Sequence, residues 1–164
     1  MKILGKHKVS SRHVRSIAID CLGLDIVAFN LFLNGIHADE SDTTKDVYEE
    51  KLSTSLLGLA VAVRTLIYQG VSKKYKFPDI NYCGFYESGN PKDIAHVSIK
   101  DICDKLIHAD HIEREFVKTK KTDQKPITKI IGSNNGKQWV LEISVSLFCE
   151  SILNWLNSID TDNM

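Results

Sequence analysis

The stretch that most constrains this fold is Leu56–Ile67, where apolar side chains would occupy almost every side of a helix. A helix that is hydrophobic all round is expected at the centre of a folded core. Its length and alanine content favour a helix over a buried strand. We therefore expect one long helix over residues 44–69, charged in its first half. Three small residues, Gly58, Ala60 and Ala62, would let neighbouring helices approach closely.

A second long helix is expected before this one, starting at Ser10 or Ser11 and ending at about Asn34. Apolar residues recur there every three or four positions, as one face of a helix requires. The polar loop between the two helices is short, which favours an antiparallel pair. Two further helices are expected over residues 98–110 and 145–158, the first opened by a capping-box pattern.

The periodicity changes from helical to alternating after the third helix. Three alternating segments, residues 112–117, 127–131 and 137–144, are expected to be strands. The Asn-Gly step between the last two is typical of a hairpin turn. Residues 71–97 contain Pro and Gly and are expected to be irregular. The sequence thus predicts a single α+β domain over residues 1–164. It has a mainly α-helical core of two long antiparallel helices plus two further helices, with a three-stranded antiparallel β-meander before the last helix.

Composition excludes several classes of protein. The 164 residues carry 21 basic and 21 acidic side chains and are 43% hydrophobic, which excludes a disordered chain. Zero net charge argues against a general nucleic-acid binder and mildly favours association, including a homo-oligomer. No run of about 18 apolar residues occurs, so we expect no membrane span. The cysteines are scattered and form no CxxC pair, which favours a reducing cytoplasm.

The balanced total conceals charged segments of opposite sign. Residues 1–15 and 114–129 are basic, whereas residues 39–50 are acidic. Such runs are usually solvated faces, but an acidic segment can also dock on a basic protein such as a nuclease toxin. The basic hairpin segment lacks the interleaved aromatic residues that nucleic-acid binding favours. The candidate partner-binding residues are therefore the carboxylates Asp39, Glu40, Asp42, Asp46, Glu49 and Glu50.

A second candidate cluster consists of Asp104, His108 and His111, which would share one face if the third helix continued through them. Imidazole and carboxylate groups at such spacings can bind zinc, but a site needs three or more well-placed ligands. The pattern contains no HExxH motif and no cysteine ligand. We therefore expect no metal or cofactor, and a structural role for His108 at the end of its helix.

The same helix resembles the C-terminal helix of HEPN-type all-α RNases over about a dozen residues. In that family a His and an Arg a few residues before it act on RNA, which would assign His108 a proton-transfer role. Residues 101–104 read Asp-Ile-Cys-Asp, so the arginine is missing and Lys100 is the nearest upstream cation. No GxSxG elbow, P-loop, GxGxxG or EF-hand motif occurs either. We expect a protein that is not an enzyme, with a divergent HEPN-like RNase or toxin using His108 as the alternative.

A second resemblance covers roughly residues 98–150. The segment Ser98–Ala109, followed by Ile-Ile-Gly at 130–132 and Gly-Lys-Gln-Trp at 136–139, is similar to small bacterial immunity proteins of contact-dependent growth inhibition systems. That resemblance implies a cytoplasmic protein that binds one cognate toxin domain and occludes its active site. The resulting expectation is an immunity or antitoxin-type protein whose partner is a protein toxin, most simply a nuclease.

Overall fold

The computed structural model describes residues 8–33, 43–69, 79–80, 83–87, 90–91, 97–114 and 127–161. The helices are α1 (Ser11–Ala28), a π-helical turn η1 (Phe29–Leu33), α2 (Thr43–Tyr68), α3 (Ile99–Ile107) and α4 (Val145–Thr161). The strands are β1 (Asp79–Ile80), β2 (Cys83–Glu87), β3 (Asn90–Pro91), β4 (Val97–Ser98), β5 (His111–Arg114), β6 (Thr128–Asn134) and β7 (Lys137–Ile143). The expected α+β fold is confirmed.

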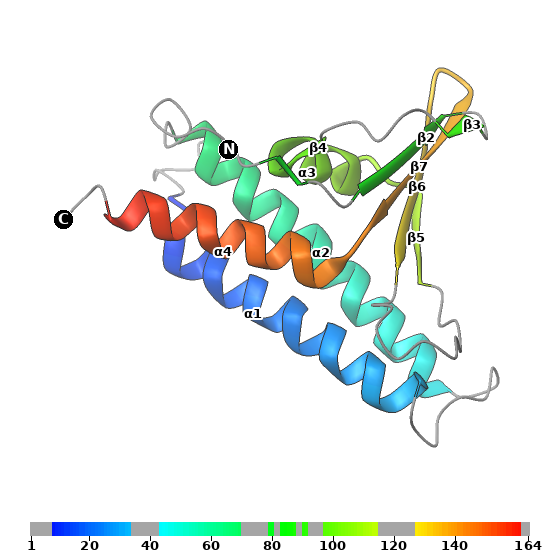
Figure 1. Cartoon of the computed structure of the whole chain (residues 1–164), viewed down its shortest axis with the longest axis horizontal. Helices are drawn as coiled ribbons and strands as arrows, with labels where there is room; N and C mark the ends of the chain where they lie inside the picture. The colour runs from blue at the N-terminus through cyan, green and yellow to red at the C-terminus, as the bar shows by residue number, and fades with distance from the viewer. Residues whose placement is uncertain are drawn as a thin grey trace, which may run out of the picture.

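The helices form one part of the molecule and the larger sheet another (Figure 1). The long helices α1 and α2 are antiparallel, as expected, and α4 packs along α1. The shorter α3 packs on α2 and brings the chain to the sheet. Their shared core includes four large side chains that are almost completely buried: Leu56, Phe148, Ile152 and Trp155.

The three-stranded meander predicted before the last helix is present as β5, β6 and β7, all antiparallel. The sheet is larger than the prediction, because β2 pairs with β7 and β3 pairs with β2. The segment expected to be irregular therefore contributes strands to the sheet. Proline and glycine interrupt that segment often enough to hide its short strands in the sequence.

Local signals in the sequence explain two element boundaries. The Ser98 hydroxyl accepts a hydrogen bond from the Asp101 N–H at 3.2 Å, and the Asp101 carboxylate accepts one from the Ser98 N–H at 3.1 Å. This reciprocal capping box starts α3 as predicted. Asn135 and Gly136 have φ angles of 51° and 75°, which suit the tight hairpin between β6 and β7.

The expectation that α2 is buried all round is wrong for one of its faces. Leu56, Leu59 and Val63 are buried in the core, but Leu57 and Val61 on the opposite side are exposed. An amphipathic pattern was not visible in the sequence because this outer face carries apolar side chains too. α2 therefore has two apolar faces. One is buried in the core of the protein, and the other is exposed to solvent.

Candidate partner-binding surface

The acidic segment predicted to bind a partner continues onto the first turns of α2. Asp46 and Glu50 are exposed there, and Glu49 is half-buried. Asp39, Glu40 and Asp42 lie outside the described residues. Within the described part of the chain, the side chains of Asp46 and Glu50 make no hydrogen bond or ion pair, so both carboxylates are available to an incoming cation.

An exposed apolar side chain accompanies these carboxylates. Val47 directly follows Asp46 in the first turns of α2 and is 63% exposed. A hydrophobic group beside charged groups is the composition expected of a protein-binding surface, in which an apolar contact is rimmed by polar ones. The surface formed by Asp46, Val47 and Glu50, with the half-buried Glu49 beside them, is called the acidic surface below.

The next residue, Tyr48, points into the protein and fixes this part of α2. Its ring packs against Phe32 of η1 with ring centroids 5.2 Å apart. Its hydroxyl accepts a hydrogen bond of 2.8 Å from Arg114 Nη1. Burial, partly offset by the Arg114 charge, raises the pKa of Tyr48, so its hydroxyl stays protonated.

Arg114 is the centre of a buried polar cluster that joins four elements. Its Nη2 forms an ion pair with Asp25 Oδ1 on α1, and the other oxygen of Asp25 accepts a hydrogen bond from the Ser146 hydroxyl on α4. The Arg114 side chain is only 1% exposed. A buried charge is costly unless it is paired and hydrogen-bonded, which this cluster achieves for Asp25 and for the two Nη atoms of Arg114.

Sequence reasoning missed this cluster, although the signals for it are present. Asp25 lies among the buried positions of α1, between Cys21 and Ala28. Arg114 occupies an inward position of β5, whose alternation leaves His111 and Glu113 exposed. The run of basic residues over 114–129 predicts a solvated surface, but its first residue, Arg114, is buried. An acid and a base on the apolar faces of two elements indicate a buried pair.

The cluster Asp104, His108 and His111 is not assembled in the structure. Asp104 pairs with two cations, Arg64 at 2.7 Å and Lys100 at 2.9 Å. His108 caps the end of α3 and is exposed. A shared site requires α3 to continue through both histidines. The helix ends at Ile107, so His108 and His111 do not extend the face that carries Asp104.

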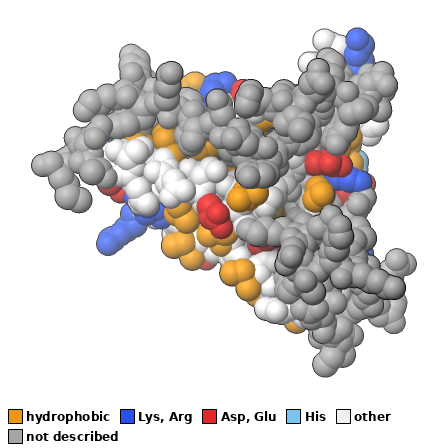
Figure 2. Space-filling view, in the orientation of Figure 1, with side chains coloured by type: hydrophobic (Ala, Val, Ile, Leu, Met, Phe, Trp, Pro, Cys, Tyr) orange, Lys and Arg blue, Asp and Glu red, His pale blue; other side chains and the backbone are white. Residues whose placement is uncertain are grey.

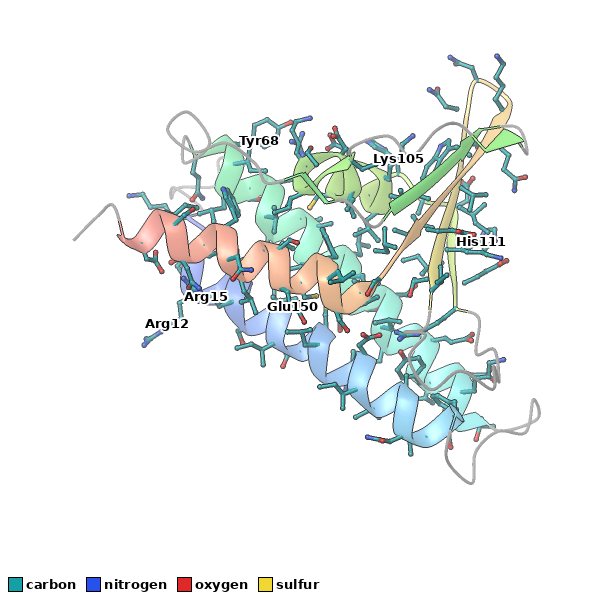
Figure 3. The ribbon with its side chains drawn as sticks, viewed as in Figure 1. Arg12, Arg15, Tyr68, Lys105, His111 and Glu150 are labelled. Atoms are coloured by element: carbon teal, nitrogen blue, oxygen red, sulfur yellow. The ribbon has the colours of Figure 1, made fainter. Side chains whose placement is uncertain are left out.

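His111 lies on β5, on the side of the sheet away from the helices (Figure 3). Its Nε2 is 3.0 Å from a carboxylate oxygen of Glu113. Among the described residues, no group of three or more His, Cys, Asp or Glu side chains could hold a metal ion. The arrangement therefore favours local ion pairs over a metal site at these positions.

Three cysteines, Cys21, Cys103 and Cys149, are free and buried. Burial raises the pKa of the Cys103 thiol. A hydrogen bond with Cys21, together with burial, raises the pKa of Cys149. A thiol with a raised pKa is a poor nucleophile, so Cys103 and Cys149 fill space in the core.

Among the described helices, α2 alone has the length and apolar composition that could cross a membrane, and 44% of its most apolar stretch is buried in the fold. Because α2 packs against α1 and α3, we interpret its apolar composition as that of a core helix.

No family model matches the chain, and no curated protein or solved structure matches it.

Proposed function

We propose that this protein binds and neutralises a basic protein toxin, most simply a nuclease, as an immunity or antitoxin-type protein of the cytoplasm. The observation that carries the proposal is the acidic surface, where Asp46 and Glu50 are exposed beside Val47 and pair with no cation among the described residues. A nuclease cleft is basic because it attracts phosphate, so an acidic surface can occupy it.

The buried cluster supports this proposal by holding the acidic surface in place. Tyr48 lies between Val47 and Glu49 in the sequence, and its contacts with Arg114 and Phe32 fix the backbone of that turn. A surface that is rigid before binding loses less conformational entropy when a partner docks. The resemblance of residues 98–150 to immunity proteins points to the same class of function.

The test begins with affinity capture of the tagged chain from its own cells, followed by identification of the captured protein. The nuclease activity of that protein is then measured with increasing amounts of the wild-type chain and of the E49K/E50K variant. We expect stoichiometric inhibition by the wild type and weaker inhibition by the variant. A captured protein whose activity the chain leaves unchanged would refute the neutralising role.

An RNA-cleavage assay separates this proposal from the HEPN-like alternative. The purified chain is incubated with RNA in the presence of a chelator, alongside the His108→Ala variant. We expect no cleavage by either protein, because His108 is an exposed helix cap whose helix has no arginine at the position of the resemblance. Cleavage that the His108→Ala variant loses would favour the RNase.

A further inference from the structure

The outer face of α2 is apolar along the middle of the helix, where a solvent-exposed helix normally carries charges. Leu57 is 45% exposed and Val61 is 48% exposed. The segment between Lys51 and Arg64 contains no charged residue. Gly58 lies beside them, and a Cβ built on it would meet no atom within 4 Å. At Gly58, therefore, no other element of the described part of the chain makes the close approach that this small residue predicts.

This face ends in an aromatic side chain that is held in position. Tyr68 is 77% exposed, and its ring lies 4.7 Å from the Arg64 guanidinium. Arg64 Nη2 donates a hydrogen bond of 2.6 Å to the Tyr68 hydroxyl. Figure 3 shows Tyr68 at the end of α2, away from the sheet. An exposed tyrosine fixed in one conformation is typical of residues that anchor protein interfaces.

The two ends of the same face carry opposite charge. The first turns hold three carboxylates, Asp46, Glu49 and Glu50, against two lysines, Lys45 and Lys51. Near the last turns, Arg64 and Lys100 face the single carboxylate of Asp104. The acidic start of α2 and the basic end that α2 forms together with α3 are complementary to the same two ends of a second copy in the antiparallel direction.

We propose that the outer face of α2 is a homodimer interface, on which a second copy packs its own α2 antiparallel. In a pair centred on Leu57, each Glu50 lies opposite Arg64 of the other copy, and the Asp46 end meets the Tyr68 end. Leu57 and Val61 of both copies form the apolar centre. Zero net charge means that no long-range repulsion opposes the association.

The exposed apolar face of α1 fits a second copy less well. Ile19, Ile26 and Val27 are exposed there, and Figure 2 shows hydrophobic side chains gathered over the region of α1 and α4. Arg12 lies at the start of this face. The described part of α1 has no exposed carboxylate at the far end to receive the Arg12 of an antiparallel copy. Charge complementarity therefore selects α2.

The dimer is tested by sedimentation equilibrium of the full chain over a wide range of concentration. We expect a monomer–dimer equilibrium that Val61→Glu weakens by at least roughly tenfold, because the change places a charge at an apolar contact. Asn154→Glu, on the exposed side of α4, is the matched control and leaves the equilibrium unchanged. A wild-type chain that stays monomeric, or a dimer that only Ile19→Glu disrupts, would overturn the inference.

Cysteine cross-linking tests the antiparallel register and does not depend on the folding of the charged variant. Leu57→Cys lies near the two-fold axis and forms an intermolecular disulfide under a mild oxidant. Asp46→Cys is the control, because its two copies would lie about 33 Å apart along the helix axes. Equal cross-linking of both variants contradicts the proposed packing.

The remaining alternative occupant of this face is a lipid surface. Vesicles of phosphatidylcholine alone and of phosphatidylcholine mixed with anionic phosphatidylserine are incubated with the wild type and with Val61→Glu, and sedimented protein is measured. We expect no binding by either. Vesicle binding by a monomeric wild type that Val61→Glu abolishes would assign the face to a membrane. Asp46 and Glu50 belong both to this interface and to the acidic surface proposed to bind a toxin, so E49K/E50K changes both. Val61→Glu leaves these carboxylates in place and tests the dimer alone, and a weakened dimer that still inhibits the toxin separates the two proposals.

Discussion

Arg114 Nη1 donates a hydrogen bond of 2.8 Å to the hydroxyl of Tyr48, and so joins the end of β5 to the first turns of α2. The same guanidinium pairs with Asp25 of α1, while Ser146 of α4 donates to Asp25. These four residues come from positions far apart in the sequence. Their cluster fixes the sheet against three helices and holds the acidic surface in one orientation.

Removal of the Arg114 charge is expected to lower the free energy of unfolding by about 3–5 kcal/mol, because Asp25 would remain buried without a counterion. The Arg114→Met variant tests this in urea denaturation. Arg12→Met is the matched control: Arg12 is exposed on α1, and its replacement should change stability by less than about 0.5 kcal/mol. Equal effects of the two substitutions would show that the buried ion pair contributes no more to the free energy of unfolding than an exposed arginine does.

A double variant separates the loss of the pair from the burial of an uncompensated charge. Asp25→Asn combined with Arg114→Met removes both charges and is expected to be less destabilising than Arg114→Met alone. The physical reason is that a neutral amide costs less to bury than a lone carboxylate. If the two substitutions are additive, the residues do not interact in the folded protein.

The helices were predictable because their signals are local. Apolar spacing located α1 and α2, and Ser98 with Asp101 located the start of α3. The pairing of β2 with β7 was not predictable, because the strand is short, lies between proline and glycine residues, and is stabilised by a partner more than fifty positions away. Long-range pairing leaves little trace in the local sequence pattern.

The candidate site was predictable only in part, for a related reason. The carboxylates Asp46 and Glu50 could be found by counting charges along the chain. The cluster that orients them depends on a tertiary arrangement that brings Asp25 to Arg114. The separation of Asp104 from His111 likewise depends on where α3 ends, and Arg64 reaches Asp104 from another helix. Spacing along one helix cannot show either fact.

Gly132 is required by the close packing of Trp139. A Cβ added at Gly132 would lie 2.2 Å from the indole atom Cζ2 of Trp139. The indole ring is buried, and Lys105 Nζ lies 4.1 Å from its centroid. We expect Gly132→Ala to lower the free energy of unfolding by about 1–3 kcal/mol, since the indole must shift in a packed core. Intrinsic fluorescence, to which Trp139 and Trp155 both contribute, measures the stability during chemical denaturation.

Gly23 provides the matched control for this substitution. It lies in the middle of α1, and a Cβ there would meet nothing within 4 Å. Gly23→Ala is expected to raise stability by about 0.5–1 kcal/mol, because alanine loses less backbone entropy in a helix. A destabilised Gly23→Ala together with a neutral Gly132→Ala would contradict the packing described for both glycines.

Stability is expected to fall at alkaline pH. Burial raises the pKa of Tyr48 and of Cys103 above their ordinary values of 10.0 and 9.0. A group with a raised pKa stabilises the fold fully below its unfolded pKa. That contribution is lost as pH rises toward the folded pKa, because the unfolded chain releases the proton first. The decline should therefore begin near pH 9 and steepen above pH 10.

Urea denaturation at several pH values measures this dependence. Cys103→Ala removes one group that the unfolded chain deprotonates above pH 9. The free energy of unfolding should then fall less steeply with pH, by as much as about 1.4 kcal/mol per pH unit above pH 9. Tyr48→Phe should act in the same way above pH 10, in addition to the cost of the lost Arg114 hydrogen bond. An alkaline slope unchanged in both variants would mean that neither group remains protonated in the folded state.

Charge reversal at the acidic surface is expected to act on the rate of association with the basic partner. Opposite charges on two proteins accelerate their encounter, whereas close contacts determine how slowly they separate. The E49K/E50K variant should therefore lower the association rate at low ionic strength by roughly tenfold or more, and added salt should reduce the difference from the wild type. Stopped-flow mixing with the captured partner protein measures both effects.

Two further variants test whether the partner binds at the acidic surface or is attracted by the overall charge of the protein. Asp20→Lys changes an exposed carboxylate on α1 and should leave the association rate nearly unchanged. Val47→Ala removes apolar contact without altering charge, so it should raise the dissociation rate and leave the association rate almost constant. If Asp20→Lys slows association as much as E49K/E50K, the overall charge of the molecule steers the encounter. The acidic surface on α2 would then not be the place where the partner binds.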